Sequence, residues 1–314
     1  MPEFLTLADL VKINDQNLAD RNITDLLNRA PFLAALPADE ASNGTTHKYT
    51  KEVGAPVVGF RNVNEGREQG KSADELVSID LKILDASFAV DKALADAYRL
   101  GPDAYVGREA ARHLRAAFFA AEQQMINGTG KADGDGFTGL ADEIGWGHQM
   151  FVNVGGAGAT ADKSSVYLVR ATEDMDNVVA ITGREGQIDI GETVVQQLTE
   201  GTTLKKYSGY YTPIEGWAGL QVGGLRSVAR IANIDDGDNK VTDDLIYQAL
   251  ERFPGWGQPT MIVMNRRSLR QLRESRTATN ATGAPAPRPT EVEGIPILTV
   301  ESISSTEATV VEPS

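Results

Sequence analysis

The sequence of 314 residues contains no cysteine, which excludes a disulfide framework, a thiolate zinc site and a cysteine nucleophile together. It also has no apolar run approaching the roughly 18 residues that span a bilayer. Its first residues lack a basic segment followed by an apolar one, so the pattern predicts no secretory signal. We therefore expect a chain that is made and kept in a cytoplasm, or that leaves it by another route, and that contacts no membrane.

Basic side chains are few relative to acidic ones, with 30 Lys and Arg against 44 Asp and Glu and a formal net charge of −14. Such a surface repels phosphate backbones and disfavours nucleic-acid binding over a broad face. Hydrophobic residues make up 41%, which is enough for a packed core, and the length suits one large domain or two ordinary ones.

Motifs that carry catalysis or metal binding are missing as well. The three histidines form no His-Glu-x-x-His pair, and no Gly-x-Ser-x-Gly turn accompanies them. The segment 128–131 lacks the earlier glycine and the following hydroxyl residue of a phosphate loop. The Asp-Gly runs at 133–136 and 235–238 lack the spacing of calcium ligands and favour turns. We expect no catalytic, cofactor-binding or metal-ligating residue.

Residues 103–127 predict the strongest helix of the chain, about 37 Å long at ~1.5 Å per residue. The Asn127-Gly128 pair is typical of a helix end. Two stripes lie on opposite faces of this helix. The apolar stripe contains Val106, Ala110, Leu114, Ala117, Ala121 and Met125, and the polar stripe contains Arg108, Arg112, Arg115 and Glu122.

Before this helix, residues 41–75 are rich in glycine and polar side chains, with strand candidates at 47–53 and 56–63. They predict a long, exposed, two-stranded loop, and loops of this length are usually functional. Strict alternation over residues 77–83 predicts a half-buried strand, which residues 88–90 continue. A short helix is expected over 91–100, before Gly101-Pro102.

After a glycine-rich boundary at 128–158, the pattern predicts a mixed α/β region. Strands are expected at 165–170, 177–182, 227–234, 260–264 and 295–300, and helices at 243–253 and 266–276. The last helix carries arginines at 266, 267, 270, 273 and 276. Nucleic-acid contact by this run is one interpretation, but a solvated or subunit-contacting face fits the acidic chain better.

The order of elements resembles the capsid-protein fold named after the Hong Kong 97 bacteriophage, an α+β fold of tailed-phage major capsid proteins. Five blocks carry the resemblance, and their collinear order is its specific part. They are the strand running through 84–91, the helix end Met125-Ile-Asn-Gly-Thr-Gly130 with Gly139-Leu140 after it, and the blocks 211–220, 227–233 and 260–269.

The resemblance implies a division of the chain into five parts. Residues 1–40 would form an N-terminal arm, 41–75 an extended two-stranded loop and 76–150 a peripheral domain with the spine helix 103–127. Residues 151–290 would form an axial α/β domain, and 291–314 would return a strand to the peripheral domain. The implied function is a structural subunit of an icosahedral shell around bacteriophage DNA, found in the virion and assembled in the host cytoplasm.

The implied partners are many copies of the same chain, in pentamers and hexamers, and DNA enclosed without sequence-specific binding. Because the chain begins almost directly with the arm, we expect a separate scaffolding protein, along with a portal. Candidate intersubunit contacts are Phe60, Arg61, Lys71, Arg108 and Arg112. Some members of the resembled family crosslink a lysine of this loop to an asparagine of a neighbouring subunit, but neither Lys51 nor Lys71 matches a crosslinking position.

Three alternatives remain open at this point. An encapsulin, which forms a bacterial cargo compartment, would share most of these features. A soluble α/β hydrolase would show a deep pocket and strongly shifted pKa values, and the long loop at 41–75 argues against it. A decoration or tail-tube protein fits the long helix and the two-domain layout less well.

Overall fold

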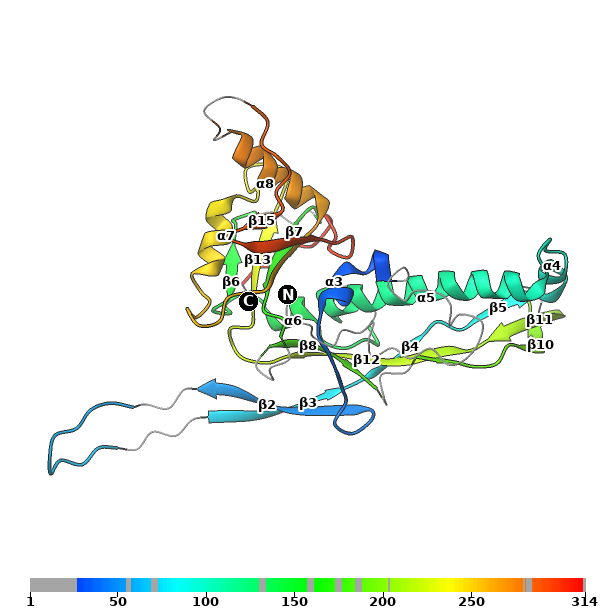
Figure 1. Cartoon of the computed structure of the whole chain (residues 1–314), viewed down its shortest axis with the longest axis horizontal. Coiled ribbons are helices and arrows are strands. Elements are labelled where there is room, and N and C mark those ends of the chain that lie inside the picture. Colours follow the sequence, from blue (N-terminus) through cyan, green and yellow to red (C-terminus); the bar gives the residue numbers. More distant parts are fainter. Residues whose placement is uncertain are drawn as a thin grey trace.

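The computed structural model describes residues 27–54, 58–68, 73–129, 134–156, 161–172, 177–183, 188–202, 204–278, 280 and 284–312. Residues 1–26 of the expected arm therefore lie outside the described residues, as does Lys71. The molecule is elongated, with an α/β lobe at one side and a long hairpin that projects beyond it (Figure 1).

Helix α5 (Pro102–Asn127) runs along the elongated half of the molecule (Figure 1). Its start combines Gly101 at φ 88° with Pro102 in the first turn, where the missing amide hydrogen has no cost. The expected bounds 103–127 are confirmed, and five of the six residues of the apolar stripe are buried. The expectation of a polar stripe on the opposite face was wrong for Glu122, which is fully buried.

Strands β2 (Thr46–Gly54) and β3 (Ala73–Asp80) form an antiparallel two-stranded sheet. The strand expected at 56–63 was wrong for residues 58–63, which join no sheet. The alternating segment supplies the partner of β2 instead, because it offers eight consecutive residues without proline or glycine. That segment is divided at Leu81, so that β4 (Lys82–Asp85) joins a different sheet.

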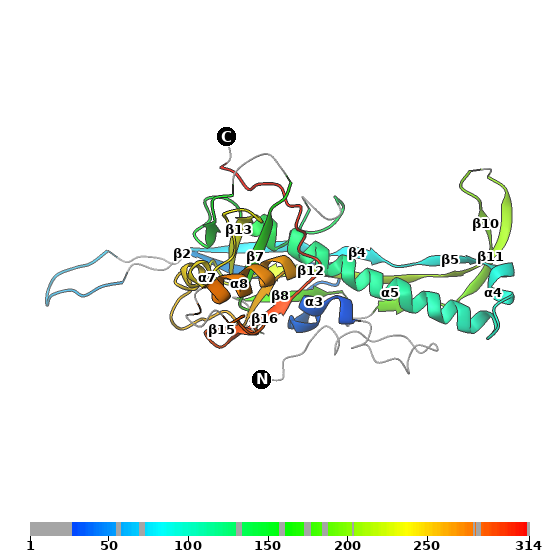
Figure 2. The same cartoon turned by 90° about the horizontal axis from the view of Figure 1, so that it is seen from above.

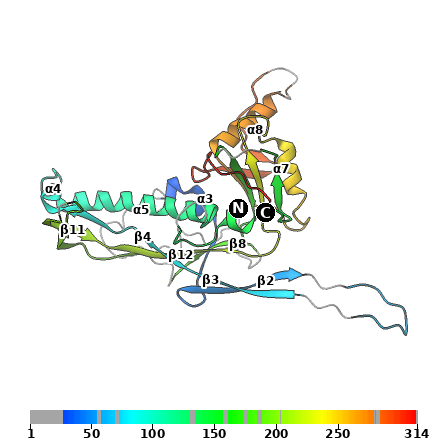
Figure 3. The same ribbon diagram turned by 180° about the vertical axis from the view of Figure 1, so that it is seen from behind.

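Two sheets lie beside α5 (Figure 3). The first has the order β1-β8-β12-β4, with β9 also paired to β12. The second has the order β10-β11-β5. Their strands are β1 (Ala38–Glu40), β5 (Phe88–Asp91), β8 (Val178–Thr182), β9 (Ile188–Ile190), β10 (Val194–Thr199), β11 (Lys206–Thr212) and β12 (Ile214–Val222).

Strand β12 joins chain segments that the sequence had assigned to different domains, because it pairs with both β4 and β8. The expected domain of residues 151–290 thus contributes residues 178–222 to the sheets beside α5. This crossing has no local sequence signal, since strand pairing is decided by tertiary contacts.

The α/β lobe contains a six-stranded sheet of order β15-β16-β14-β7-β13-β6. Its strands are β6 (Phe151–Asn153), β7 (Ser164–Val169), β13 (Val228–Ile234), β14 (Met261–Met264), β15 (Glu291–Val292) and β16 (Ile295–Thr299). Helices α7 (Asp243–Leu250) and α8 (Arg266–Ala278) complete the lobe.

The expectation that the last strand returns to the domain of the spine helix was wrong, because β16 pairs in parallel with β14. All four residues of β14 are buried, so both of its edges need a hydrogen-bonding strand. The C-terminal part of the chain forms its hydrogen bonds to α5 after β16 has ended. The short elements are η1 (Leu27–Arg29), α3 (Pro31–Ala35), α4 (Lys92–Asp96) and α6 (Leu140–Glu143).

Candidate assembly site

The hairpin β2–β3 and the loop beyond it extend away from the rest of the chain in all three views (Figures 1, 2 and 3). Near the far end of this loop, Val58, Phe60 and Val63 are exposed to 85%, 106% and 88%. A phenylalanine exposed to this extent buries none of its apolar surface within its own chain. Such a group gains free energy only when a second molecule covers it.

Local polar contacts shape the loop around Phe60. The Asn62 side-chain amide donates to the Glu65 carboxylate at 2.8 Å, and the Arg61 guanidinium donates to the Asn62 and Glu65 carbonyls at 3.4 and 3.3 Å. Arg61 is thereby used within the loop and remains exposed. The contacts keep residues 61–65 in a turn beside the exposed ring of Phe60.

The root of the hairpin is fixed to the body by buried contacts. The Tyr49 hydroxyl donates to the Val222 carbonyl at 3.0 Å, and a ring nitrogen of His47 lies 2.8 Å from the Gln221 side-chain oxygen. Burial raises the pKa of Tyr49 to about 12, so the hydroxyl remains a donor throughout the physiological range. Lys51 pairs with Glu143 at 3.3 Å. The root is therefore anchored, whereas the far end is unsupported.

Arg108 and Arg112 lie in the first half of α5. That helix starts beside α4, at the end of the molecule opposite the hairpin (Figure 1). The Arg108 guanidinium lies 5.1 Å from the ring centres of both Tyr98 and Tyr105. Arg112 pairs with Glu109 at 2.7 Å, and its side chain is 56% exposed. The structure thus does not bring the two arginines together with Phe60 and Arg61 within one chain.

Glu122 is the buried polar centre of the body. Its Oε2 accepts hydrogen bonds from the Phe32 and Leu33 amides at 2.7 and 3.2 Å, and its Oε1 accepts from the Ser302 hydroxyl at 2.6 Å. The Ala30 side chain makes no cap for α3, so Glu122 satisfies the free amides of that helix from a distant position. One carboxylate thus ties α3, α5 and the C-terminal segment together.

The end of α5 is closed by a glycine-dependent turn, which explains part of the resemblance motif. Gly128 has φ 68°, and a Cβ there would lie 1.8 Å from Asp142 Oδ2. A Cβ on Gly139 would lie 2.5 Å from the Gly128 amide nitrogen. Asp142 accepts from the Thr129 and Gly139 amides at 2.9 and 3.1 Å. The turn therefore needs glycine at 128 and 139 for space.

The turn is also joined to the C-terminal segment, because the Asn127 side-chain amide donates to the Ser302 carbonyl at 3.0 Å. Asn127 is 7% exposed. The sequence predicted Asn127 only as a helix stop, and its side-chain role depends on a residue 175 positions away.

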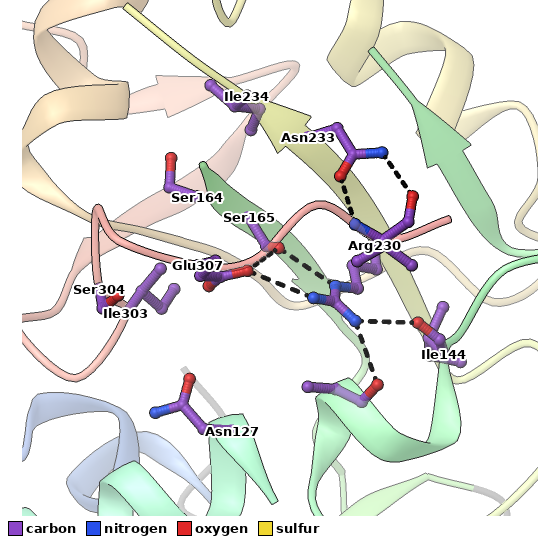
Figure 4. A network of polar contacts seen from close by, with 12 residues as sticks. Asn127, Ile144, Ser164, Ser165, Arg230, Asn233, Ile234, Ile303, Ser304 and Glu307 are labelled. Atoms are coloured by element: carbon purple, nitrogen blue, oxygen red, sulfur yellow. Dashed lines mark hydrogen bonds and ion pairs between the residues drawn. The ribbon is translucent and has the colours of Figure 1, made fainter. Parts of the chain in front are cut away.

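Arg230 forms the second buried junction (Figure 4). Its guanidinium contacts the Glu307 carboxylate at 3.3 Å and the Ser165 hydroxyl at 3.1 Å, and it donates to the Ala141 and Ile144 carbonyls at 3.1 and 3.3 Å. Arg230 and Glu307 are 2% and 3% exposed. This network joins the segment after α5 to the six-stranded sheet and the C-terminal segment.

The three histidines all have structural contacts. His47 is buried at the hairpin root, and the His113 ring stacks on Phe88 at 4.9 Å between ring centres. The His148 ring nitrogen accepts from the Met150 amide at 3.2 Å, and burial lowers its pKa. Among the described residues, no cluster of His, Asp and Glu could hold a metal ion. No helix in the described ranges is long and apolar enough to cross a membrane.

Comparison with solved structures defines the class of protein first. The chain is similar to a subunit in the cryo-EM structure of bacteriophage Epsilon15, with a TM-score of 0.60 and 19% identity over 87% of this chain and 88% of that one. It also matches a capsid subunit of bacteriophage JBD30, at TM-score 0.48 and 11% identity over 92% and 94% of the two chains. The Epsilon15 match shows that this chain shares the fold of that bacteriophage subunit.

The family assignment is more specific. The model of the family "major capsid protein GP7" matches residues 15–311, and the chain belongs to this family. It is thus a structural subunit of a bacteriophage capsid shell, located in the virion capsid. An encapsulin from Synechococcus elongatus is also matched, at TM-score 0.43 and 12% identity over 67% of this chain and 89% of that one. No curated protein matches the sequence.

Proposed function

We propose that the hairpin and its loop form the intersubunit element through which copies of this chain assemble into pentamers and hexamers. The observation that carries the proposal is Phe60, a fully exposed aromatic ring near the end of a hairpin whose root is anchored by Tyr49 and His47. Aromatic side chains in this situation are typical anchors of protein interfaces.

Arg61, Lys71, Arg108 and Arg112 complete the proposed set of intersubunit contacts. Arg61 and Arg112 are exposed, so their charged groups are accessible to a neighbouring copy. The loop that carries Arg61 and the start of α5 lie toward opposite ends of the elongated molecule (Figure 1). In a heterologous contact, one end of a subunit meets a different surface of the next, and closed rings form where the rotation between successive subunits closes.

The proposed layout follows the observed pairing, not the sequence boundaries. The six-stranded sheet with α7 and α8 serves as the axial domain at the five-fold and six-fold positions. Helix α5 and the two sheets beside it serve as the peripheral domain, and the chain up to residue 40 serves as the arm. Glu122 and Arg230 hold these parts in a fixed relation.

The wider assembly remains part of the proposal. A separate scaffolding protein and a portal take part, the shell encloses DNA without sequence-specific binding, and assembly takes place in the host cytoplasm. The net charge of −14 supports this, because a container with an acidic subunit does not adhere broadly to its DNA.

The test is removal of residues 62–72, which lie beyond the hairpin strands. The expected variant keeps the circular dichroism spectrum and melting temperature of the wild type, because the buried root contacts remain, yet forms no shells in negative-stain images. Normal shells from this variant would remove the loop from the assembly mechanism.

A point substitution separates the ring from the loop as a whole. Phe60→Ser should reduce the yield of shells, whereas Trp256→Ala, which removes another largely exposed aromatic ring, should leave it close to the wild type. Equal losses from both substitutions would mean that exposed apolar area in general, and not Phe60, drives assembly.

A further inference from the structure

A cleft with a volume of about 900 Å³ lies between three segments of the chain. These are the stretch around η1 and α3, helix α8, and residues 288–301. Helix α3 contacts β16, and both lie close to α8 in the view of Figure 2. Glu122 accepts hydrogen bonds from the first amides of α3 and so helps to position this wall of the cleft.

Arginine dominates the walls of this cleft. Arg29 comes from the segment before α3, Arg266, Arg270 and Arg273 come from α8, and Arg288 comes from the following loop. The one acidic residue of the lining is Glu301. Five guanidinium groups around one cavity are unusual in a chain whose net charge is −14.

The five arginines of α8 divide by face, which explains why they occur at this spacing. Arg267 donates to the Asp162 and Ile234 carbonyls at 3.0 and 3.2 Å, and Arg276 pairs with Asp243 at 2.7 Å. These two arginines hold the helix to the lobe. Arg266, Arg270 and Arg273 face the cleft instead.

Internal pairing neutralises only part of the cleft charge. Arg270 pairs with Asp236 and Glu274, at 2.5 and 3.0 Å, and Arg266 lies 3.6 Å from Glu301 in a pair that is mostly exposed. The five guanidinium groups of the cleft carry five positive charges and their three carboxylate partners carry three negative ones, so a net charge of +2 remains. Within the described residues, Arg29 and Arg288 are exposed and have no acidic partner.

We infer that this cleft binds the phosphate backbone of nucleic acid, as a local and sequence-independent contact between the shell subunit and its DNA. The inference rests on the proposed enclosure of DNA. Planar guanidinium groups match phosphate oxygens in pairs, and the apolar part of the lining is small, being Pro31, Leu269 and Pro289. A docked peptide would need more apolar surface for anchoring.

The acidic remainder of the molecule makes the cleft the favourable place for this contact. A surface of net charge −14 repels phosphate elsewhere, so binding is confined to one position in each subunit. Weak contacts of this kind add up over many copies in a shell without holding the DNA tightly at any one of them.

The test uses the full-length chain and a fluorescent single-stranded oligonucleotide of thymidines, with binding followed by fluorescence anisotropy over a range of salt concentrations. The double variant Arg29→Glu with Arg288→Glu is compared with Arg99→Glu with Arg226→Glu. All four arginines are exposed, and each pair changes the net charge by four, from −14 to −18. The pairs differ in that Arg99 and Arg226 lie outside the cleft.

The cleft variant should bind the oligonucleotide about tenfold or more weakly than the control does. The slope of log K against log salt should become less steep by about 1.4, because two single-strand phosphate contacts are lost and each contributes about 0.7. Equal affinities in the two double variants, or no wild-type binding at low salt, would overturn the inference. Displacement of the oligonucleotide by an equal charge of oligoglutamate would assign the cleft to an acidic peptide instead.

Shell formation by the same variants separates this inference from the proposed function. Wild-type protein that forms no shells under any condition counts against the proposed function. Shells that form normally, together with binding that is insensitive to the cleft arginines, count against the cleft alone.

Discussion

The Ser302 hydroxyl donates a hydrogen bond to the Glu122 carboxylate at 2.6 Å, across 180 positions of sequence. The other oxygen of the same carboxylate accepts the Phe32 and Leu33 amides. A single buried side chain thus fixes the start of the described chain, its long helix and its last part. In the proposed assembly, this contact would fix where the N-terminal arm leaves the body.

Removal of the Glu122 carboxylate should therefore be costly. Glu122→Ala leaves two buried amides and one buried hydroxyl without their acceptor, and we expect a loss of about 3 kcal/mol or more in the free energy of unfolding. Glu122→Gln keeps an acceptor for the amides and can donate to Ser302, so it should cost about 1 kcal/mol or less. Urea unfolding of both variants measures the difference, and equal losses would show that the acceptor geometry is unimportant.

The same residue should make stability depend on pH in a defined direction. Burial raises the pKa of Glu122, against the three hydrogen bonds that lower it. A carboxyl with a raised folded pKa binds its proton more tightly when folded, so ionisation costs stability as pH rises from about 4.3, the unfolded value, through the folded pKa. The unfolding free energy of Glu122→Gln relative to the wild type should therefore increase between about pH 4 and pH 7. A constant difference would contradict the assignment.

Glycine 128 should be irreplaceable for steric reasons. Gly128→Ala places a methyl group into the Asp142 carboxylate at a residue with φ 68°, and we expect a loss of about 3 kcal/mol or more. Gly107→Ala is the matched control, because a Cβ at that position in the interior of α5 meets nothing within 4 Å. It should stabilise the protein by about 0.5–1 kcal/mol. Thermal melting of both variants decides, and similar shifts in the two would contradict the account.

Arg230 and Glu307 should behave as a coupled pair. Arg230→Met leaves the buried Glu307 carboxylate without its cation, and we expect a loss of about 3–5 kcal/mol. Adding Glu307→Gln to that variant should restore part of the loss, because the stranded charge is removed. A double-mutant cycle from chemical unfolding gives the coupling energy. Strictly additive losses would show that the two side chains act independently.

The sequence predicted the local elements well where periodicity is strong. The alternation around Val77 and Ile79 and the stripe through Leu114 each follow from one element and its exposed face. Glu122 was misassigned because its apolar surroundings come from residues near positions 32 and 302. Helical periodicity reports which face is polar, but it does not report a distant donor that makes burial of a carboxylate possible.

The partners of strands were harder to predict than the strands. Residues 295–299 were expected as a strand and form one, yet their partner is β14 and not the region of the spine helix. The long strand β12 and the hairpin β10–β11 were not expected at all. Some of their residues, such as Tyr207 and Trp217, are exposed large side chains, and the pairing of distant strands is decided by tertiary contacts.

The candidate assembly residues were only partly accessible from sequence. Phe60 was predicted as an intersubunit contact in the expected loop; the structure shows it fully exposed, and its role in assembly stays a prediction. The cleft arginines were recognised as a basic run on one helix. Their association with Arg29 and Arg288 depends on three chain segments meeting, which no local pattern encodes.

The most direct measurement is negative-stain electron microscopy of the purified chain, expressed alone and together with the genes that neighbour it. A shell subunit should give hollow particles tens of nanometres across, or rings of subunits. A uniform field of monomers or dimers under every condition, including with a candidate scaffolding protein, would contradict the account.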